Sequence, residues 1–533
     1  MQKEIVDSLV DSLGRKVIHS PDQIREQTMA TFPLQRNVVA VVKAENSSDI
    51  SLLLKIANKF KVAVYPFSTG NNWGYGNVNS VSSNTILIDL SSMKKIVDFD
   101  EQLGVVTLQP GVTQGQLSQF LIESGYDYLV PVTGAGPNCS ILANALERGY
   151  GLTPIGDHFQ AVMSLKAILP DGSSYQSMHA NLGAENSCIS YKWGVGPYLD
   201  GLFTQGNFGV VTEMSIALKK RPESIVCFFI EVDEIKFEEA VALVQKLLTQ
   251  SHGLIGGMNI MNSKRVMAMK GIPYKEVVRA KSDLQRKKIL KKHKISDWTI
   301  IGSIYGTKGT VRAVKKDIKR EFKHVATKKL FFDKKTLIWL KRLSSNMPFF
   351  PKILKEQIND LGSVFELLDG IPNEFALKQP YWCKGTGSLG SPIQPQKDQC
   401  GLIWFAPIIP MKINIMKKFI KKVEKICADF NIEPLITFSS VSERCFDSTM
   451  PILFDMSSEV QSEKARECMT ILVDEVQKIG CYPYRIDVEM MRKLINEEGE
   501  STHWQQIARL KKAFDPNYIL APGRYSPFAV KNE

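Results

Sequence analysis

The segment VAVYPFSTGNNWGYG, residues Val62 to Gly76, decides how the first part of this chain folds. A short β-rich run reaches Pro66 and gives way to small and polar residues, with Trp73 and Tyr75 at the far end. Such a loop lets the backbone approach a ligand closely and present N–H groups, as a diphosphate requires. It matches neither G-x-G-x-x-G nor G-x-x-x-x-G-K-[ST], which disfavours Rossmann and P-loop chemistry. A plain turn also explains it, because Gly and Asn favour turns.

The composition is that of a globular protein, with 533 residues, 44% hydrophobic and 23% charged. This length predicts two or more folding units. No secretory segment or membrane-spanning apolar run is found, so we expect a soluble, cytoplasmic protein without a membrane partner. The nine cysteines include no C-x-x-C pair, which argues against a disulfide framework and a zinc site, and we expect no metal.

The net charge of +12 is concentrated in two stretches, Gln285–Lys294 and Val311–Lys329. Apolar residues recur within both, so they are predicted to be helices with solvated basic faces. Nucleic-acid binding is the alternative, and no nucleic-acid-binding motif accompanies them. Attraction of an anionic ligand or partner is also open.

Three zones follow one another along the chain. The first mixes strand-like runs with a helix over Ser47–Phe60, for which Ser48 or Asp49 is the expected cap. The second repeats a strand followed by an amphipathic helix four times, which predicts a sheet with helices on one face. The third is a tail from Pro483 that contains a helix and a flat terminal segment. The fold class is therefore α+β.

Two more segments are rich in small residues. They are VPVTGAGPNCSILANALERGYG, residues Val130–Gly151, and LFTQGNFGVVTEMSIAL, residues Leu202–Leu218. Three such loops are suited to wrap a long, phosphorylated, ring-bearing cofactor.

Seven motifs then carry a resemblance. VYPFSTGNNWGYG, LERGYGLTPIGDHF, KWGVGPYLDGLFTQGNFGVVTEMSIAL, WTIIGSIYG, LIWFAPI, YPYRIDVEMM and DPNYILAPGR occur in this order. The set resembles the vanillyl-alcohol oxidase and 4-cresol dehydrogenase family of FAD enzymes, from about Val38 to Arg524. The resemblance implies a two-part FAD-binding domain, residues 1–222 and 483–533, around an inserted α+β cap domain, residues 223–482, whose sheet is covered by helices.

The same resemblance implies which residues contact FAD. Arg485 would face the pyrimidine end of the flavin, where a cation stabilises the charge left by hydride transfer. The other expected contacts are Ser68, Thr69, Gly70, Asn71, Asn72, Pro131, Val132, Ser140, Asn144, Glu147, Gly149, Gly206, Asn207, Gly209, Val210 and Arg524.

Tyr75, Tyr484 and Arg485 match the catalytic residues of phenol-oxidising members, which bind the substrate as a phenolate. A bound phenolate pushes electron density to its para carbon, so that hydride leaves to the flavin and a quinone methide forms. Tyr75 and Tyr484 are equally well explained as aromatic side chains of a cavity wall.

The sequence departs from the family at several positions. Val132 stands where phenol oxidases place an acid–base aspartate, and Asp157 is a weak substitute that is better explained as structural. No histidine pair for FAD attachment is present near Asp447 and Ser448. Asn71 and Val130 replace the histidine and cysteine that attach FAD in other relatives. We therefore expect noncovalent FAD.

The predicted function is an FAD-dependent oxidoreductase that removes hydride from a C–H bond next to a hydroxyl or aromatic ring, in a para-substituted phenol. The alternatives are a non-phenolic hydroxy acid, sugar or secondary-metabolite alcohol as substrate, and more distantly a nucleic-acid-binding protein or non-catalytic scaffold. The electron acceptor, oxygen or a redox partner, stays open, as does a homo-oligomeric state.

Overall fold

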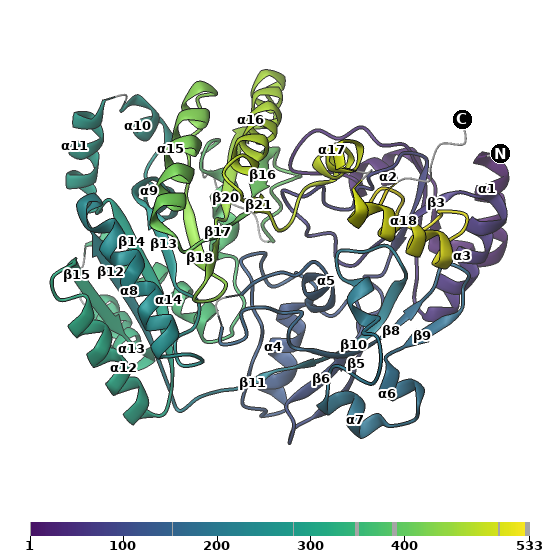
Figure 1. The fold of residues 1–533 in the computed structure, drawn as a ribbon, viewed down its shortest axis with the longest axis horizontal. Helices are drawn as coiled ribbons and strands as arrows, with labels where there is room; N and C mark the ends of the chain where they lie inside the picture. The colour runs from purple at the N-terminus through teal and green to yellow at the C-terminus, as the bar shows by residue number, and fades with distance from the viewer. Residues whose placement is uncertain are drawn as a thin grey trace.

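The computed structural model describes residues 2–151, 153–280, 282–346, 351–385, 392–498 and 501–527. Two parts lie side by side in Figure 1, the early segments in purple and blue and the middle segments in teal and green. The yellow C-terminal helices return to the purple part. Within the described ranges, no helix has the length and apolarity needed to cross a membrane.

The first sheet carries the loop at Ser68. Its order is β1 (Val17–Ile18), β2 (Val38–Lys43), β4 (Thr85–Asp89) and β3 (Ala63–Phe67), with β2, β4 and β3 parallel. Helices α1 (Gln2–Leu13) and α3 (Ser47–Phe60) pack on it. The cap of α3 is Asn46, whose side chain accepts a hydrogen bond from the Asp49 amide at 3.0 Å, so the cap expected at Ser48 or Asp49 was wrong. Asn46 fits because its extended backbone aims Oδ1 at the free N–H groups of the first turn.

A second sheet completes the early part. It is antiparallel, in the order β5 (Ile96–Asp100), β6 (Val105–Leu108), β10 (Val210–Ala217), β8 (Val162–Ile168) and β9 (Ser174–Gln176). Helices α4 (Gln114–Glu123) and α5 (Ile141–Leu146) share a buried core with it. The second glycine-rich loop enters α5, and the third leads into β10.

The middle part is built on an eight-stranded sheet. Its order is β15 (Ala326–Phe332), β12 (Ser224–Val232), β14 (Trp298–Gly306), β13 (Asn259–Asn262), β18 (Thr437–Ser440), β19 (Cys445–Asp447), β17 (Pro407–Pro410) and β21 (Tyr482–Pro483). A separate pair, β16 (Cys400–Phe405) and β20 (Met450–Asp455), lies next to it in Figure 1.

Helices cover both faces of this sheet, not one face. Helices α8 (Phe237–Gln250), α12 (Lys308–Glu321), α15 (Ile413–Asp429) and α16 (Glu459–Gln477) share one core with Phe228 and Ile230 of β12. Helices α9 (Ser263–Met269), α13 (Lys334–Asn346) and α14 (Lys352–Leu368) share another with Cys227. Successive residues of a strand point to opposite faces, and both faces of β12 are apolar, so both require cover.

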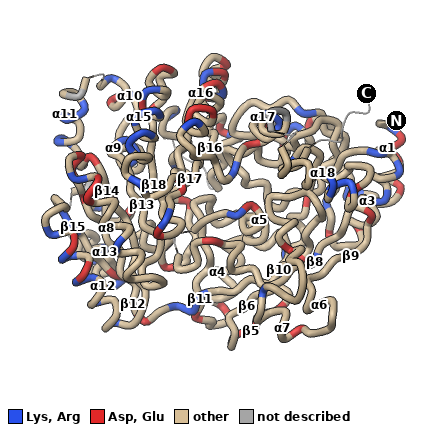
Figure 2. Tube along the Cα trace, viewed as in Figure 1, with Lys and Arg blue, Asp and Glu red and all other residues tan. Residues whose placement is uncertain are grey.

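The first basic stretch forms α11 (Asp283–His293) as predicted, whereas the second is helical only as far as Glu321, the end of α12, and its last residues from Ala326 lie in strand β15. Val311, Val314 and Ile318 are buried on the sheet side of α12, which leaves its lysines and arginines on the outer side. Figure 2 shows blue segments on both helices and red segments interspersed along the chain.

The C-terminal tail is fixed by a buried ion pair in α18 (Thr502–Phe514). Lys511 Nζ lies 2.7 Å from the carboxylate of Asp515 and donates to the carbonyls of Asn207 at 2.6 Å and Leu520 at 2.8 Å. The tail then pairs with β3, since Ala521 N donates to Val64 O at 2.7 Å. This anchoring brings Arg524 to the first glycine-rich loop.

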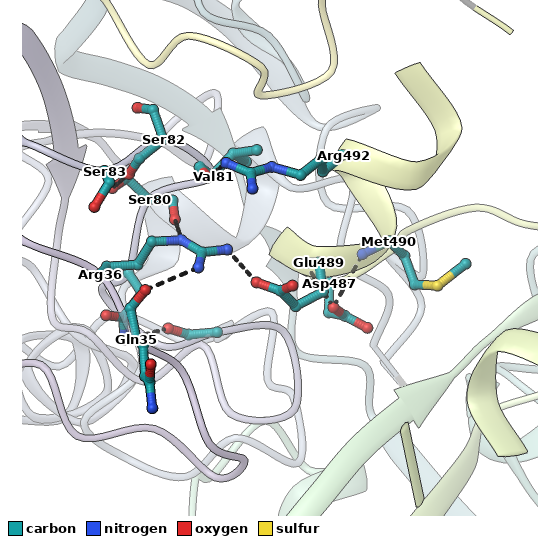
Figure 3. Close-up of polar contacts among 12 residues, drawn as sticks. Gln35, Arg36, Ser80, Val81, Ser82, Ser83, Asp487, Glu489, Met490 and Arg492 are labelled. Carbon is teal, nitrogen blue, oxygen red and sulfur yellow. Dashed lines mark hydrogen bonds and ion pairs between the residues drawn. The ribbon is translucent and has the colours of Figure 1, made fainter. Parts of the chain in front are cut away.

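A second set of polar contacts fixes α17 (Val488–Glu498), which follows Tyr484 and Arg485. Figure 3 shows Arg36 paired with Glu489, while Arg36 Nε donates to Ser80 O at 3.1 Å. The buried Asp487 accepts the amides of Glu489 at 2.9 Å and Met490 at 3.2 Å. The start of α17 is therefore held by both the early loops and its own cap.

Candidate active site

Two adjoining cavities lie between the glycine-rich loops and the eight-stranded sheet. The loop cavity, of about 400 Å³, is lined by all three loops. The sheet cavity, of about 670 Å³, is lined by strands β13, β18 and β19, by α9 and by the second loop. Eight residues line both cavities and form their junction: Thr133, Gly134, Tyr150, Arg265, Ala376, Gln379, Thr449 and Tyr484.

Most residues expected to contact FAD line the loop cavity. They are Ser68, Thr69, Gly70, Asn71, Asn72, Ser140, Asn144, Glu147, Gly149, Gly206, Gly209, Val210, Arg485 and Arg524. Val132 lines the sheet cavity instead. Pro131 is not among the lining residues of either, and Asn207 is buried where its side chain donates to Ala521 O at 3.0 Å and to Ser526 Oγ at 2.7 Å.

The first loop presents free backbone donors to the loop cavity. Within the described ranges, the amides of Thr69, Gly70, Asn71 and Asn72 donate no hydrogen bond to the protein. Gly70 has φ of +72°, and a Cβ there would lie 2.9 Å from Val78 Cγ1, so the close turn requires glycine. Consecutive free N–H groups in a lined cavity suit a diphosphate, so these residues fit FAD.

A buried carboxylate joins two arginines at the wall of the loop cavity. Glu147 Oε2 lies 2.9 Å from Arg485 Nε, and Glu147 also pairs with Arg524. Burial alone would raise the pKa of Glu147, but the two guanidinium charges outweigh it and the pKa is lowered. Arg485 Nη2 donates to Asn72 Oδ1 at 2.5 Å, so the cluster also reaches the first loop.

Tyr75, Tyr484 and Arg485 are brought together as predicted. The Arg485 guanidinium lies 4.1 Å from the Tyr75 ring centroid, and Tyr75 and Tyr484 both line the loop cavity. Tyr150 packs edge-on against Tyr484, with ring centroids 5.1 Å apart. Burial raises the pKa of Tyr75 and of Tyr484, and Arg485 offsets this only in part. Both phenols therefore stay protonated and available as hydrogen-bond donors.

Backbone contacts hold these two tyrosines in place. Val488 N donates to Tyr75 O at 3.3 Å, and Tyr484 N donates to Ala406 O at 3.2 Å. Gln205 Nε2 donates to Tyr484 O at 3.0 Å, which adds the third loop. Residues more than 400 positions apart are thus aligned by main-chain bonds.

The strand register builds one wall of the sheet cavity. Asn259 of β13 faces Ser439 of β18, and Ser439 faces Asp447 of β19. These three residues form one cross-strand row, and all of them line the cavity. A polar row on an otherwise apolar face is suited to bind a polar ligand.

Asp447 is a site residue that sequence reasoning did not assign. It is 4% exposed, Thr449 Oγ1 donates to its Oδ2 at 2.7 Å, and its Oδ1 has no partner in the described chain. Burial raises the pKa of Asp447 to about 7. The sequence signal is an acid at the end of a short apolar run, at the place where the histidine pair of the family is missing.

Asp157 and His158 do not join the tyrosines. Asp157 accepts the Gln160 amide at 3.1 Å, and neither residue is among those that line the two cavities. Burial lowers the pKa of His158 to about 4, and its Nδ1 lies 2.5 Å from Asn144 Oδ1. The neutral ring supports Asn144 at the loop cavity.

Comparisons with known proteins agree with this arrangement. A family model described as an FAD binding domain matches residues 38–176. The chain is 28% identical to 1'-carboxy-chondrochloren decarboxylase of Chondromyces crocatus, over 93% of this chain and 92% of that protein. It is 25% identical to the 4-cresol dehydrogenase (hydroxylating) flavoprotein subunit of Pseudomonas putida, over 91% and 87%.

Among solved structures, p-cresol methylhydroxylase with substrate bound matches with a TM-score of 0.85 at 23% identity, over 99% of this chain and 97% of that chain. The family model and the two relatives support the resemblance to the vanillyl-alcohol oxidase and 4-cresol dehydrogenase family, and the solved structure supports the fold. The predicted family and α+β fold class are confirmed, and the chain is an FAD-dependent oxidoreductase. The domain boundaries at 222 and 482 stay a prediction.

Asp447 is expected to make stability depend on pH. Its folded pKa of about 7 exceeds that of an unfolded aspartate, about 3.9, so the folded state binds more protons between these values. The free energy of unfolding therefore falls as pH rises through this window. We expect Asp447→Asn to match the wild type at pH 4 and to be more stable at pH 8 by about 1–3 kcal/mol.

Thermal and denaturant unfolding at both pH values measure this difference. Asp455→Asn is the control, because hydrogen bonds from Ser457 lower the pKa of Asp455 and the sign is reversed. An Asp447→Asn effect of equal size at both pH values would contradict the expectation.

Proposed function

We propose that this enzyme oxidises a para-substituted phenol by removing hydride from the carbon attached to the ring opposite the hydroxyl. The observation that carries the proposal is the convergence of Tyr75, Tyr484 and Arg485, with Tyr484 at the junction of the two cavities. The Pseudomonas putida relative, named as a cresol dehydrogenase, supports a phenolic substrate.

FAD, when bound, supplies the hydride acceptor. The free amides of Thr69 to Asn72 would hold its diphosphate, and Arg485 and Arg524 would contribute positive charge. Glu147 balances one of those two charges, so the cluster keeps a net positive charge to oppose the charge of the reduced cofactor.

The two tyrosines would bind the substrate oxygen. Since both hydroxyl groups stay protonated, each can donate to a phenolate, and Arg485 offsets its charge. Electron density moves from the phenolate oxygen into the ring. Hydride then leaves from the para substituent, and the substrate becomes a quinone methide. Holding the oxygen by fixed donors orients that carbon for transfer.

Asp447 is the carboxyl group available for the following proton transfer. Water that adds to the quinone methide forms a C–O bond and releases a proton, and the free Oδ1 of Asp447 is suited to accept it. A pKa of about 7 gives such a base useful strength near neutral pH. Asp447 would thus replace the aspartate that the family places at the position of Val132.

Noncovalent attachment of FAD is part of the proposal. Asn71 donates its side-chain amide to Asn138 O at 2.9 Å, and Asp447 and Ser448 stand where the histidine pair is missing. We expect acid precipitation of the yellow holoenzyme to leave all of the flavin in the supernatant. Protein pellets that keep their colour after washing would contradict this.

Substitutions at the tyrosines test the phenol reaction. We expect Tyr484→Phe and Tyr75→Phe to lower kcat/KM for 4-cresol and 4-ethylphenol by about 100-fold each, the size reported for the loss of one fixed donor to a developing charge. Anaerobic bleaching of the flavin measures the hydride step directly. Tyr198→Phe is the control, since Tyr198 lies outside both cavities.

Unchanged bleaching rates in both tyrosine variants would contradict phenolate chemistry. That result would favour the other substrate classes expected from the sequence, a hydroxy acid, sugar or secondary-metabolite alcohol. The same anaerobic screen, run with lactate and simple sugars, distinguishes them.

Oxidative decarboxylation is the second candidate reaction, and the name of the Chondromyces crocatus relative favours it. In a 3-(4-hydroxyphenyl)propanoate, hydride loss from the benzylic carbon gives a quinone methide. The electron pair of the C–CO₂ bond then restores the phenolate, CO₂ leaves and a vinylphenol remains. We expect 4-vinylphenol and CO₂ in equal amounts, and formation of only the hydroxylated acid would exclude this route.

Oxygen and a protein redox partner are both retained as electron acceptors. The Pseudomonas putida relative is named as a flavoprotein subunit, which supports a partner protein. A cytoplasmic location remains part of the proposal.

A further inference from the structure

One arginine at the junction of the cavities has two buried side-chain nitrogens that make no hydrogen bond within the described part of the chain. Arg265 is the third residue of α9 and lines both the loop cavity and the sheet cavity. Its backbone is fixed, since Arg265 N donates to the side chain of the cap residue Asn262 at 2.9 Å. The helix therefore presents this side chain at a set position.

The guanidinium is desolvated without compensation. Nε and Nη1 of Arg265 are shut off from solvent and make no hydrogen bond to any described residue. Burial lowers its pKa to about 10, with no acidic neighbour to oppose the shift. Removing a charge from water without a partner costs free energy, which a protein accepts when a ligand supplies the missing group.

Other arginines near these cavities do have partners. Arg485 and Arg524, which line the loop cavity, both pair with Glu147. Arg265 differs from them although it occupies an equally enclosed position.

The surroundings of Arg265 also favour an anion. Gln379 Nε2 and Thr437 Oγ1 also line the sheet cavity, are buried without a partner among the described residues, and can donate to an anion, whereas the unpartnered Oδ1 atoms of Asn259 and Asp447 are acceptors. Lysines 275, 378 and 384 line the cavity and are exposed, whereas its acidic lining residues are Asp360 and Asp447. A cavity with more cations than anions attracts and binds anionic ligands.

We propose that Arg265 binds a carboxylate of the substrate, so that the preferred substrates are para-hydroxyphenyl carboxylic acids. This inference rests on the proposed phenol oxidation and names its substrate class. The hydroxyl end lies against Tyr75 and Tyr484, and the acid end reaches Arg265. A ligand across the junction contacts both ends, since Tyr484 and Arg265 each line both cavities.

Paired ligands on the FAD-loaded enzyme test this assignment. The acids are 4-hydroxybenzoate, 4-hydroxyphenylacetate and 3-(4-hydroxyphenyl)propanoate, and the neutral probes are phenol, 4-cresol and 4-ethylphenol. Anaerobic titration of the flavin spectrum gives Kd, and bleaching gives the rate. We expect the best acid to bind more tightly than its neutral counterpart in the wild type, and the chain length of that acid to report the span between the two ends.

Arg265→Met is expected to weaken binding of that acid by about 10- to 100-fold, the range for a hydrogen-bonded charge. Binding of the neutral phenol stays within about twofold. Arg265→Lys keeps the charge, and its Kd for the acid is expected to lie between those of the wild type and Arg265→Met. Lys323→Met is the control, because it removes one positive charge from an exposed residue that lines neither cavity.

The variants are expected to fold. Loss of an unpaired buried charge leaves the melting temperature of Arg265→Met equal to or above that of the wild type. If Arg265→Met does not fold, Arg265→Lys decides the same question through the ratio of acid to neutral Kd.

Several outcomes would overturn the inference. In Arg265→Met, binding of acids and of neutral phenols could be weakened equally, or neither could change. Loss of FAD affinity in this variant would instead assign Arg265 to the cofactor. Failure of the proposed function gives a different result. If phenols are not oxidised but 3-phenylpropanoate still perturbs the flavin in an Arg265-dependent way, the carboxylate site stands and phenol oxidation does not.

Discussion

The buried carboxylate of Glu147 is the interaction on which the site depends. Glu147 ends α5 in the second loop. It pairs with Arg485, which follows the last strand of the eight-stranded sheet, and with Arg524 of the C-terminal tail. Each arginine alone would be a costly buried charge, and so would the glutamate. Together they join three segments that are far apart in sequence and leave one net positive charge beside the loop cavity. The same contacts set Arg485 over Tyr75, so the relative position of these two side chains follows from this ion-pair cluster.

The eight-stranded sheet contributes through its register. One cross-strand row carries Asn259, Ser439 and Asp447 to the same cavity wall, and a shift of one residue in any strand would turn its member to the opposite face of the sheet. The opposite face is packed with Phe228, Ile260 and Phe438, which fixes that register by excluding polar side chains. The core packing on the opposite face of the sheet therefore fixes this polar wall of the sheet cavity.

Much of the cofactor half could be predicted from sequence, because its loops are local motifs. Ser68 to Asn72 and Tyr75 are close in the chain, so one short segment carries them into the same loop. Asp447 and Arg265 could not be assigned in that way. Their assignment rests on side-chain atoms that have no partner among the described residues, and only the folded structure shows this. From its sequence neighbours Val266, Met267 and Ala268, Arg265 would be predicted to be a solvated helix residue. Only the structure shows the cavity beside it.

Arg265 and Asp447 show how this cavity keeps its binding capacity. They have opposite charge and line the same space, yet neither contributes to the pKa shift of the other, whereas Asp447 does influence Tyr75 and Tyr484. Placing one on β19 and the other on α9 holds them apart. A direct ion pair would stabilise the empty protein and remove both the anion-binding group and the base. The unpaired arrangement costs stability, and binding of a ligand with a hydroxyl end and an acid end restores it. Separation of these two charges is thus what makes the cavity selective for such a ligand.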